Sequence, residues 1–302
     1  MRTVPSDFQS IDPARAYLVD MAAKPPRIAV DDILGAHPTE KSVFSDWAHV
    51  GDRHTSELLP HRILAHSGAQ ETLPIEGLRQ ILVKHHASKE KLKRAASLRA
   101  ILAKWGRHKT VRGLRLFPTN PNTQKGNLAE CLLCEYVDAT GKAKTLVYRL
   151  RHNPNVDQSM KGDDLLAFRF EEGSSGLIVG EAKFRAAADK AVVVALCDAL
   201  ARSQRGGLPI SLQFVADRLF EAGQAALGKQ VLDCALHFVE KTLVIDYAGL
   251  LLSDNKSASH VDRHASATTF RCAIISMSLA DPAALVKNCF ENLEEKYGFD
   301  TH

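Results

Sequence analysis

The sequence lacks any apolar run that approaches the ~18–20 residues needed to cross a bilayer. The most apolar stretch, residues 191–201, is interrupted by Asp198. The first residues contain neither an apolar segment nor a small-residue cleavage site, so we expect no secretory signal. These absences argue against a membrane protein and predict a cytoplasmic one.

Cysteine is scarce, and the Gly-rich loop of nucleotide hydrolases is missing. The six cysteines lie mostly in apolar periodic stretches, which is typical of buried thiols rather than of disulfide bridges. Cys131 and Cys134 have the spacing of half a zinc site, but no second pair follows at a suitable interval. Without a phosphate-binding loop, the protein is not expected to hydrolyse nucleotides itself.

Net charge is small, at +4, but positive charge is concentrated in one segment. Between Lys84 and Arg115 there are eleven Lys or Arg and a single acid, Glu90. Such segregation is typical of a DNA-contacting surface, because neutralised phosphates release counterions. A surface that docks on an acidic partner gives the same pattern. We therefore predict DNA or partner contact at Lys91, Lys93 and Arg94, without choosing between the two.

Length and periodicity predict two regions, because 302 residues is long for a single core. Residues 1–109 contain short helical stretches broken by prolines, then two amphipathic helices at 74–86 and 88–105. We expect a mostly helical N-terminal region that is basic near its end. Residues 110–302 are expected to form an α/β domain, with a mixed sheet flanked by helices.

Alternating and helical periods place the elements of the second region. A helix is predicted at 123–139 and another after Asp281. Between them we expect strands at 145–151, 164–170, 177–184, 242–252 and 269–279, and helices at 187–205, 210–223 and 225–240. Arg149 and Arg151 alternate on the first of these strands and are candidates for phosphate contact, although exposed strand arginines are equally often only solvated.

An apolar run at residues 177–179 leads into two charged residues, Glu181 and Lys183. Acids and lysines are rarely buried without partners, and side chains two apart on a strand leave the same face. Asp163 and Asp164 begin the preceding strand. If the connecting loop has an even number of residues, Asp164 faces Glu181 and Asp163 points away; a three-residue loop would reverse the choice.

Two carboxylates from adjacent strands form a hard-oxygen site suited to Mg²⁺ or Mn²⁺. Asp164 and Glu181 are the expected metal ligands, with Asp163 as the alternative acid and the main-chain carbonyl of Ala182 as a third ligand. Lys183 would orient or deprotonate an attacking water. Glu130, on the preceding helix, would support the hydrated metal. A structural ion pair explains the same residues without any catalysis.

The order helix Glu, strand Asp, then Glu-x-Lys resembles the PD-(D/E)XK nuclease superfamily. More specifically, segments 125–130, 160–164 and 179–184 are similar to those of the HamA family, the nuclease subunits of Hachiman antiphage systems. The resemblance covers about residues 110–300. Lys161 departs from it, since a His is expected there in the His-Gly-x-Asp form.

This resemblance implies a restriction-endonuclease-like core and a metal-dependent DNase, using Mg²⁺ or Mn²⁺, that acts in antiphage defence. It also implies a superfamily 2 helicase partner (HamB-like) that controls cleavage. Asp164, Glu181 and Lys183 would inherit the catalytic roles and Glu130 a supporting one. The alternative is a non-catalytic DNA-binding or regulatory subunit of a helicase complex, in which the acid pair is structural.

Overall fold

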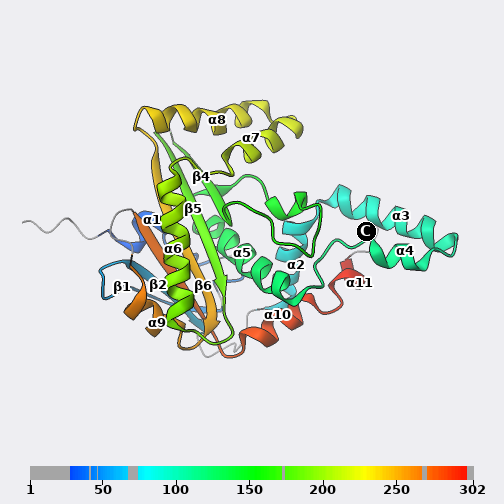
Figure 1. Cartoon of the computed structure of the whole chain (residues 1–302), viewed down its shortest axis with the longest axis horizontal. Coiled ribbons are helices and arrows are strands. Elements are labelled where there is room, and N and C mark those ends of the chain that lie inside the picture. The colour runs from blue at the N-terminus through cyan, green and yellow to red at the C-terminus, as the bar shows by residue number, and fades with distance from the viewer. Residues whose placement is uncertain are drawn as a thin grey trace, which may run out of the picture.

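A seven-stranded mixed sheet forms the centre of the protein. The computed structural model describes residues 28–297 except 41, 46, 67–73, 172, 173 and 267–270. Within that part, the strands follow the order β1-β2-β7-β6-β5-β4-β3, and helices cover both faces (Figure 1). The expected α/β class, a mixed sheet flanked by helices, is therefore confirmed.

The middle of the sheet is parallel and its two sides are antiparallel. The strands are β1 (Ala48–His54), β2 (Pro60–His66), β3 (Lys144–Thr145), β4 (Leu165–Glu171), β5 (Ser174–Phe184), β6 (Val244–Asp254) and β7 (Cys272–Leu279). Strands β2, β7, β6 and β5 run parallel to their neighbours in this group, whereas β1–β2, β3–β4 and β4–β5 are antiparallel. Every residue of β7 is buried, as expected for a parallel strand covered on both faces.

The helices form a layer on each face of the sheet. They are α1 (Val30–Leu34), α2 (Ile75–His86), α3 (Lys89–Lys104), α4 (His108–Gly113), α5 (Pro121–Thr140), α6 (Lys190–Gly206), α7 (Leu212–Glu221), α8 (Ala225–Val239), α9 (Ser257–His264), α10 (Pro282–Phe290) and α11 (Leu293–Tyr297). Apolar residues of α1, α2, α5 and α10 share one core with the sheet, and those of α6, α7, α8 and α9 share the other.

Helix α5 confirms the helix predicted at 123–139, and eight of its residues belong to the first core. Its N-terminus is capped by Asn120, whose side chain accepts hydrogen bonds from the N–H groups of Asn122 and Thr123. Pro121 suits the first turn, where no intrahelical N–H bond is lost, and Gly141 ends the helix in the left-handed conformation. These caps define the residues at which α5 begins and ends beside β5.

The N-terminal region is not mostly helical as expected. Residues 48–66 form the β1–β2 hairpin, and β2 extends the sheet by pairing with β7. The hydrophobic pattern hid β2 because His61 and Arg62 are buried there with specific partners. Residues 1–27 lie outside the described part, so that portion of the expectation is not tested. A domain boundary at residue 109 stays a prediction, and the sheet contains strands from both sides of it.

The strand expected at 145–151 is also wrong. In this part of the chain only Lys144 and Thr145 pair with β4. Arg149–His152 form a 3-10 turn. Leu150 is buried at the centre of that turn, while the arginines on either side of it leave in other directions. The alternation of polar and apolar residues thus came from a turn rather than from a strand.

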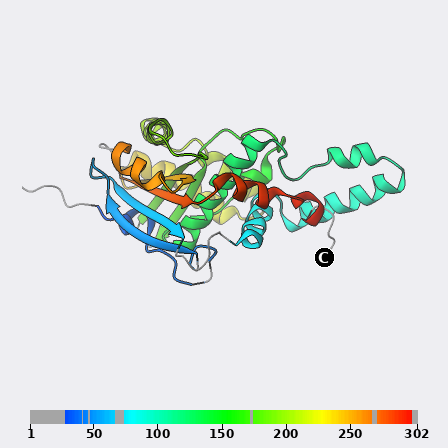
Figure 2. The ribbon, with the colours of Figure 1, turned by 90° about the horizontal axis from the view of Figure 1, so that it is seen from below.

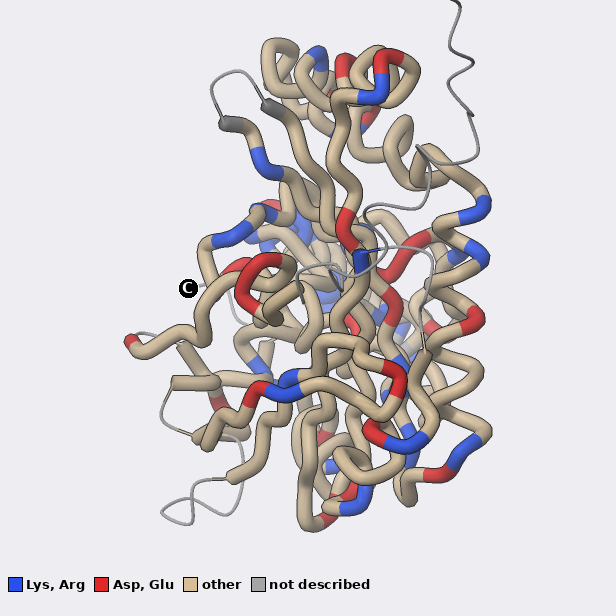
Figure 3. Tube along the Cα trace, turned by 90° about the vertical axis from the view of Figure 1, so that its left-hand side faces the viewer, with Lys and Arg blue, Asp and Glu red and all other residues tan. Residues whose placement is uncertain are grey.

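Helices α3 and α4 project from the body as an arm, residues 89–113 (Figures 1 and 2). Ser88 caps α3, since the N–H of Lys91 donates to its hydroxyl at 3.1 Å, as expected from the sequence. Seen from the side opposite the arm, acidic and basic residues are interspersed along the described trace (Figure 3). Nine of the eleven Lys and Arg residues between Lys84 and Arg115 lie on the arm.

Two expectations about absent features can be compared with the described residues. All six cysteines are free and buried, as predicted for thiols that belong to the core. None of the described helices is both long and apolar enough to span a membrane.

His86 at the end of α2 makes stability depend on pH. Its Nδ1 bonds the carbonyl of Leu82 at 2.8 Å and its Nε2 the amide of Asn127 at 2.9 Å, so the ring is neutral. Burial lowers the pKa of His86 from 6.5 to about 4. Between these values the unfolded chain binds the proton and the folded protein does not. This histidine therefore lowers stability as pH falls from 6.5 toward 4, by up to about 3 kcal/mol.

We therefore expect His86→Gln to reduce the pH dependence of unfolding in this window, because glutamine can keep a donor and an acceptor without titrating. Urea unfolding of both proteins across the window measures the difference. The exposed His49 provides a control, since His49→Gln should leave the slope unchanged. Equal slopes for the wild type and His86→Gln would contradict the assignment.

Candidate functional site

The β4–β5 hairpin brings Asp164 and Glu181 to the same place. Pairs run from Leu165 with Gly180 to Glu171 with Ser174, so two residues separate the paired strands, which is the even number that the sequence argument required. One step beyond the paired residues, the N–H of Asp164 donates to the carbonyl of Gly180 at 3.1 Å. By this register Asp164 faces Glu181, as expected for an even loop.

Asp163 points away from this place. Its carboxylate accepts hydrogen bonds from the N–H of Ser211 at 3.3 Å and from the hydroxyl of Ser203 at 3.4 Å. Its own N–H donates to the Ser211 hydroxyl at 3.0 Å. Asp163 is buried and ties the start of β4 to the start of α7. The structure therefore favours Asp164 over Asp163 as the acid that faces Glu181.

Two glycines permit this local geometry. Gly162, which precedes the two acids, has a φ of +124°, a backbone conformation that residues other than glycine rarely adopt. At Gly180, a Cβ would lie 2.8 Å from Cβ of Leu165 and 2.9 Å from a methyl of Leu133 on α5. Gly180 thus allows α5 to approach β5 directly beside Glu181.

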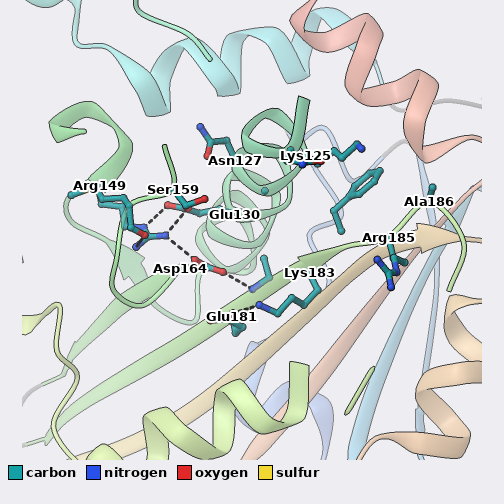
Figure 4. Close-up of a pocket in the computed structure, with 15 residues that line it drawn as sticks. Lys125, Asn127, Glu130, Arg149, Ser159, Asp164, Glu181, Lys183, Arg185 and Ala186 are labelled. Carbon is teal, nitrogen blue, oxygen red and sulfur yellow. Dashed lines mark hydrogen bonds and ion pairs between the residues drawn. The ribbon is translucent and has the colours of Figure 1, made fainter. Parts of the chain in front are cut away.

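A cavity of about 520 Å³ opens where these residues meet. It lies between the first half of α5, the 3-10 turn, the start of β4 and the end of β5 (Figure 4). Its charged lining residues are Lys125, Glu130, Arg149, Asp164, Glu181, Lys183 and Arg185. The cavity thus brings together all four residues to which the resemblance gives catalytic or supporting roles.

Arg149 is largely buried on a 3-10 turn and is not exposed on a strand, while its contact with phosphate stays a prediction. Its guanidinium binds both carboxylate oxygens of Glu130, at 2.6 and 2.8 Å, and Oδ1 of Asp164 at 2.7 Å. A third nitrogen donates to the carbonyl of Met160 at 3.2 Å. Burial alone would lower the pKa of Arg149, but the hydrogen bond and charge of Glu130, with the charge of Asp164, outweigh it and raise that pKa.

Asp164 lies close to two other carboxylates, those of Glu130 and Glu181. Burial raises the pKa of its carboxyl well above the usual range, and the charges of Glu130 and Glu181 raise it further. Arg149 and the N–H of Ala182, which donates to Oδ2 at 2.9 Å, act in the opposite direction. A carboxyl whose pKa is shifted by burial and by neighbouring charges is a candidate for a functional role.

Glu181 and Lys183 leave the same face of β5, as expected from their spacing. Their side chains form an ion pair and remain partly exposed to the cavity (Figure 4). On the sequence alone, a structural ion pair and a catalytic acid–lysine pair were both possible. The geometry alone does not separate them, but the position beside Asp164 places both side chains next to a second carboxylate.

The donor set fits a hard divalent cation. Asp164 and Glu181 supply carboxylate oxygens, and the carbonyl of Ala182 points to the same side of β5 as its N–H, which bonds Asp164. Such oxygens are the ligands that Mg²⁺ and Mn²⁺ prefer. Among the described residues, however, no three His, Cys, Asp or Glu side chains are arranged as a ready metal-binding group. A cation here would rely on two carboxylates, a carbonyl, water and substrate.

The basic residues that were predicted to contact DNA or a partner lie in two different environments. Lys91 donates to the carbonyls of His86 and Arg151, at 3.2 and 3.0 Å, and Arg151 donates to the carbonyl of Lys84 at 2.8 Å. These half-buried side chains hold the base of the arm against the body. Lys93 and Arg94 are exposed on α3, away from these contacts.

Sequence reasoning missed Arg149 as a member of the site and Asn127 as a lining residue. The signal for Arg149 was hidden, because a buried arginine is recognisable only from the acids around it. His86 orients Asn127 through the hydrogen bond described above, and these residues are 41 positions apart in the chain. Neither contact can be recognised from the spacing of neighbouring residues in the sequence.

Together the sheet and the cavity define an α/β protein with an acid–lysine cluster beside a strand end. A family model described as HamA matches residues 42–293. The Hachiman protein HamA of Bacillus cereus is 35% identical over 264 residues, which cover 87% of this chain and 95% of that protein. The chain therefore belongs to the HamA family. The match begins well before residue 110, so the similarity also includes the β1–β2 hairpin and the arm.

Cation binding at this site should release protons. A carboxyl must lose its proton to ligate a metal, and the pKa of Asp164 is raised, so protons compete with the cation further toward neutral pH than usual. We expect Mn²⁺ affinity to rise as pH increases from mildly acidic to mildly alkaline. Calorimetric titrations in two buffers of different ionisation enthalpy measure the released protons. Asp217→Asn, which changes an exposed residue outside the cavity, should behave like the wild type, and identical heats in both buffers would contradict the prediction.

Proposed function

We propose that this protein is a metal-dependent DNase of the PD-(D/E)XK type, with a restriction-endonuclease-like core, that acts in antiphage defence. The observation that carries the proposal is the convergence of Asp164, Glu181 and Lys183 in one cavity, with Glu130 beside them. Three separate segments of the chain supply these residues. Membership in the HamA family supports the same assignment.

In this proposal Asp164, Glu181 and the Ala182 carbonyl hold Mg²⁺ or Mn²⁺. The cation, when bound, polarises the phosphodiester and stabilises the charge that develops on it. Lys183 orients the attacking water and accepts its proton. Lys125 and Arg185, which also line the cavity, lie where they can contact DNA phosphates.

The helicase partner that the resemblance implies is also part of the proposal, as a superfamily 2 subunit that controls access of DNA to the site. The arm offers it a surface. On α3, Leu98, Ile101 and Trp105 are 45%, 57% and 75% exposed and recur at helical spacing on one face. Large exposed apolar side chains suit a protein partner better than DNA. Lys93 and Arg94 add charges that an acidic rim or a phosphate can meet.

A non-catalytic subunit remains the second candidate, and one observation favours it. Arg149 pairs with Glu130 and Asp164, and Lys183 pairs with Glu181, so the acids already have partners without any metal. In that case the cluster stabilises the hairpin and does not hydrolyse DNA.

Substitution of the acid–lysine pair separates the two candidates. We expect Glu181→Gln and Lys183→Ala each to reduce Mg²⁺-dependent DNA cleavage by at least about a hundredfold, because each removes a group needed in the transition state. Cleavage of plasmid DNA is measured for the protein alone and together with its helicase partner. The secondary structure and unfolding temperature of each variant report whether it folds.

Glu221→Gln and Lys229→Ala, which change exposed residues outside the cavity, are matched controls and should cut normally. Normal cleavage by both site variants would contradict the catalytic assignment. Absence of cleavage from the wild type under every condition, with the partner present, would favour the non-catalytic subunit.

The arm can be tested separately from the site. If Lys93 and Arg94 meet phosphates, their joint replacement by Ala should flatten the salt dependence of DNA binding, with the slope falling by roughly one for each phosphate that is no longer neutralised. Ile101→Ser with Trp105→Ser should instead weaken partner binding and leave this slope unchanged. Replacement of the exposed Arg205 and Lys229 is the matched control. If neither arm variant changes either binding curve, the arm contacts neither DNA nor the partner.

A further inference from the structure

We propose that Arg149 is a positioning residue that competes with a divalent cation for Asp164. The guanidinium of Arg149 donates a hydrogen bond to Oδ1 of Asp164, and it must give up this contact when a cation binds there. The inference rests on the proposed function, because it presumes a cation between Asp164 and Glu181. It adds a residue that sets how readily the site accepts the cation.

The contacts of Asp164 show why competition follows. Its Oδ2 already accepts the Ala182 N–H at 2.9 Å, and its Oδ1 accepts Nη2 of Arg149 at 2.7 Å. A divalent cation on Oδ1 would stand next to the guanidinium charge. Two positive charges at this separation repel strongly in a partly buried site, so both cannot occupy that oxygen at their usual distances.

The other contacts of Arg149 allow it to leave Asp164 without leaving the site. Glu130 binds the guanidinium through two parallel hydrogen bonds, and this paired geometry is the strongest that a carboxylate offers an arginine. The carbonyl of Met160 holds a third nitrogen. Release of Asp164 therefore costs one hydrogen bond out of four. Glu130 thus keeps the arginine beside the site, which explains a buried acid on α5 that need not touch the metal itself.

Removal of Arg149 should consequently strengthen metal binding. We expect Arg149→Gln to bind Mn²⁺ at least about tenfold more tightly than the wild type in the absence of DNA, because no charge-assisted hydrogen bond has to be displaced. DNA cleavage by this variant should nevertheless fall, since Glu130, a buried carboxylate beside the site, is then without its two hydrogen bonds from the arginine. Tighter metal binding combined with slower cleavage is a result that a purely structural role would not give.

Isothermal titration with MnCl₂ measures the affinity, and thermal unfolding reports folding. Arg169→Gln is the matched control, since Arg169 is equally buried, at 11% side-chain exposure, and also pairs with an aspartate, Asp246, outside the cavity. It should lower the unfolding temperature without changing Mn²⁺ affinity. Arg149→Lys keeps the charge but not the paired hydrogen bonds to Glu130, so its affinity should lie between those of the wild type and Arg149→Gln.

An unchanged or weaker Mn²⁺ affinity in folded Arg149→Gln would overturn the inference while leaving the proposed function intact. If Arg149→Gln does not fold, Arg149→Lys decides, and no gain in affinity there overturns the inference as well. A wild type that binds no Mn²⁺ at this site, judged by identical titrations of the wild type and Asp164→Asn, would overturn both the inference and the proposed metal dependence.

Discussion

The structure around the cavity depends on one electrostatic constraint: Glu130, Asp164 and Glu181 are carboxylates that line the same largely buried space. Their mutual repulsion and their burial both favour protonation of Asp164. The protein offsets this with two cationic side chains and one backbone N–H. The partly buried carboxylate of Asp164 keeps its position through partners on two elements, Arg149 on the 3-10 turn and the N–H of Ala182 on β5.

The fold maintains this crowding through close packing rather than through the charges themselves. Gly180 lets α5 approach β5, so Glu130 reaches the strand end, and the buried carboxylate of Asp163 ties the start of β4 to α7. The parallel centre of the sheet fixes the height of β5 against β6 over nine residue pairs from Gly176 to Phe184. An arrangement that is unfavourable for isolated charges persists because many apolar contacts hold the backbone around it.

Local patterns predicted the part of the site that lies on neighbouring strands. The parity of the β4–β5 loop was enough to place Asp164 opposite Glu181, because side chains alternate along strands with a fixed period. The same reasoning failed for Arg149, since a 3-10 turn and a strand can share an alternating pattern. It failed for β2 because His61 and Arg62 are buried through hydrogen bonds to Asp262 and Asp52, which no hydrophobic period reveals. Both predictions failed at residues that are held by polar contacts to residues distant in the sequence.

The 3-10 turn also connects the cavity to the arm. Arg149 points from it to Asp164, whereas Arg151 lies 4.7 Å from the centre of the Tyr148 ring and bonds the carbonyl of Lys84, just before the arm begins. Lys91 of α3 closes this contact on the carbonyl of Arg151. Two distant surfaces influence one another only if an element between them has two arrangements that both surfaces favour differently. Arg149 bound to Asp164 and Arg149 released from it are two such arrangements. Under the proposed competition for Asp164, a partner that displaces the arm would act on the turn that carries Arg149, so the arm and the proposed cation site would be coupled through that turn.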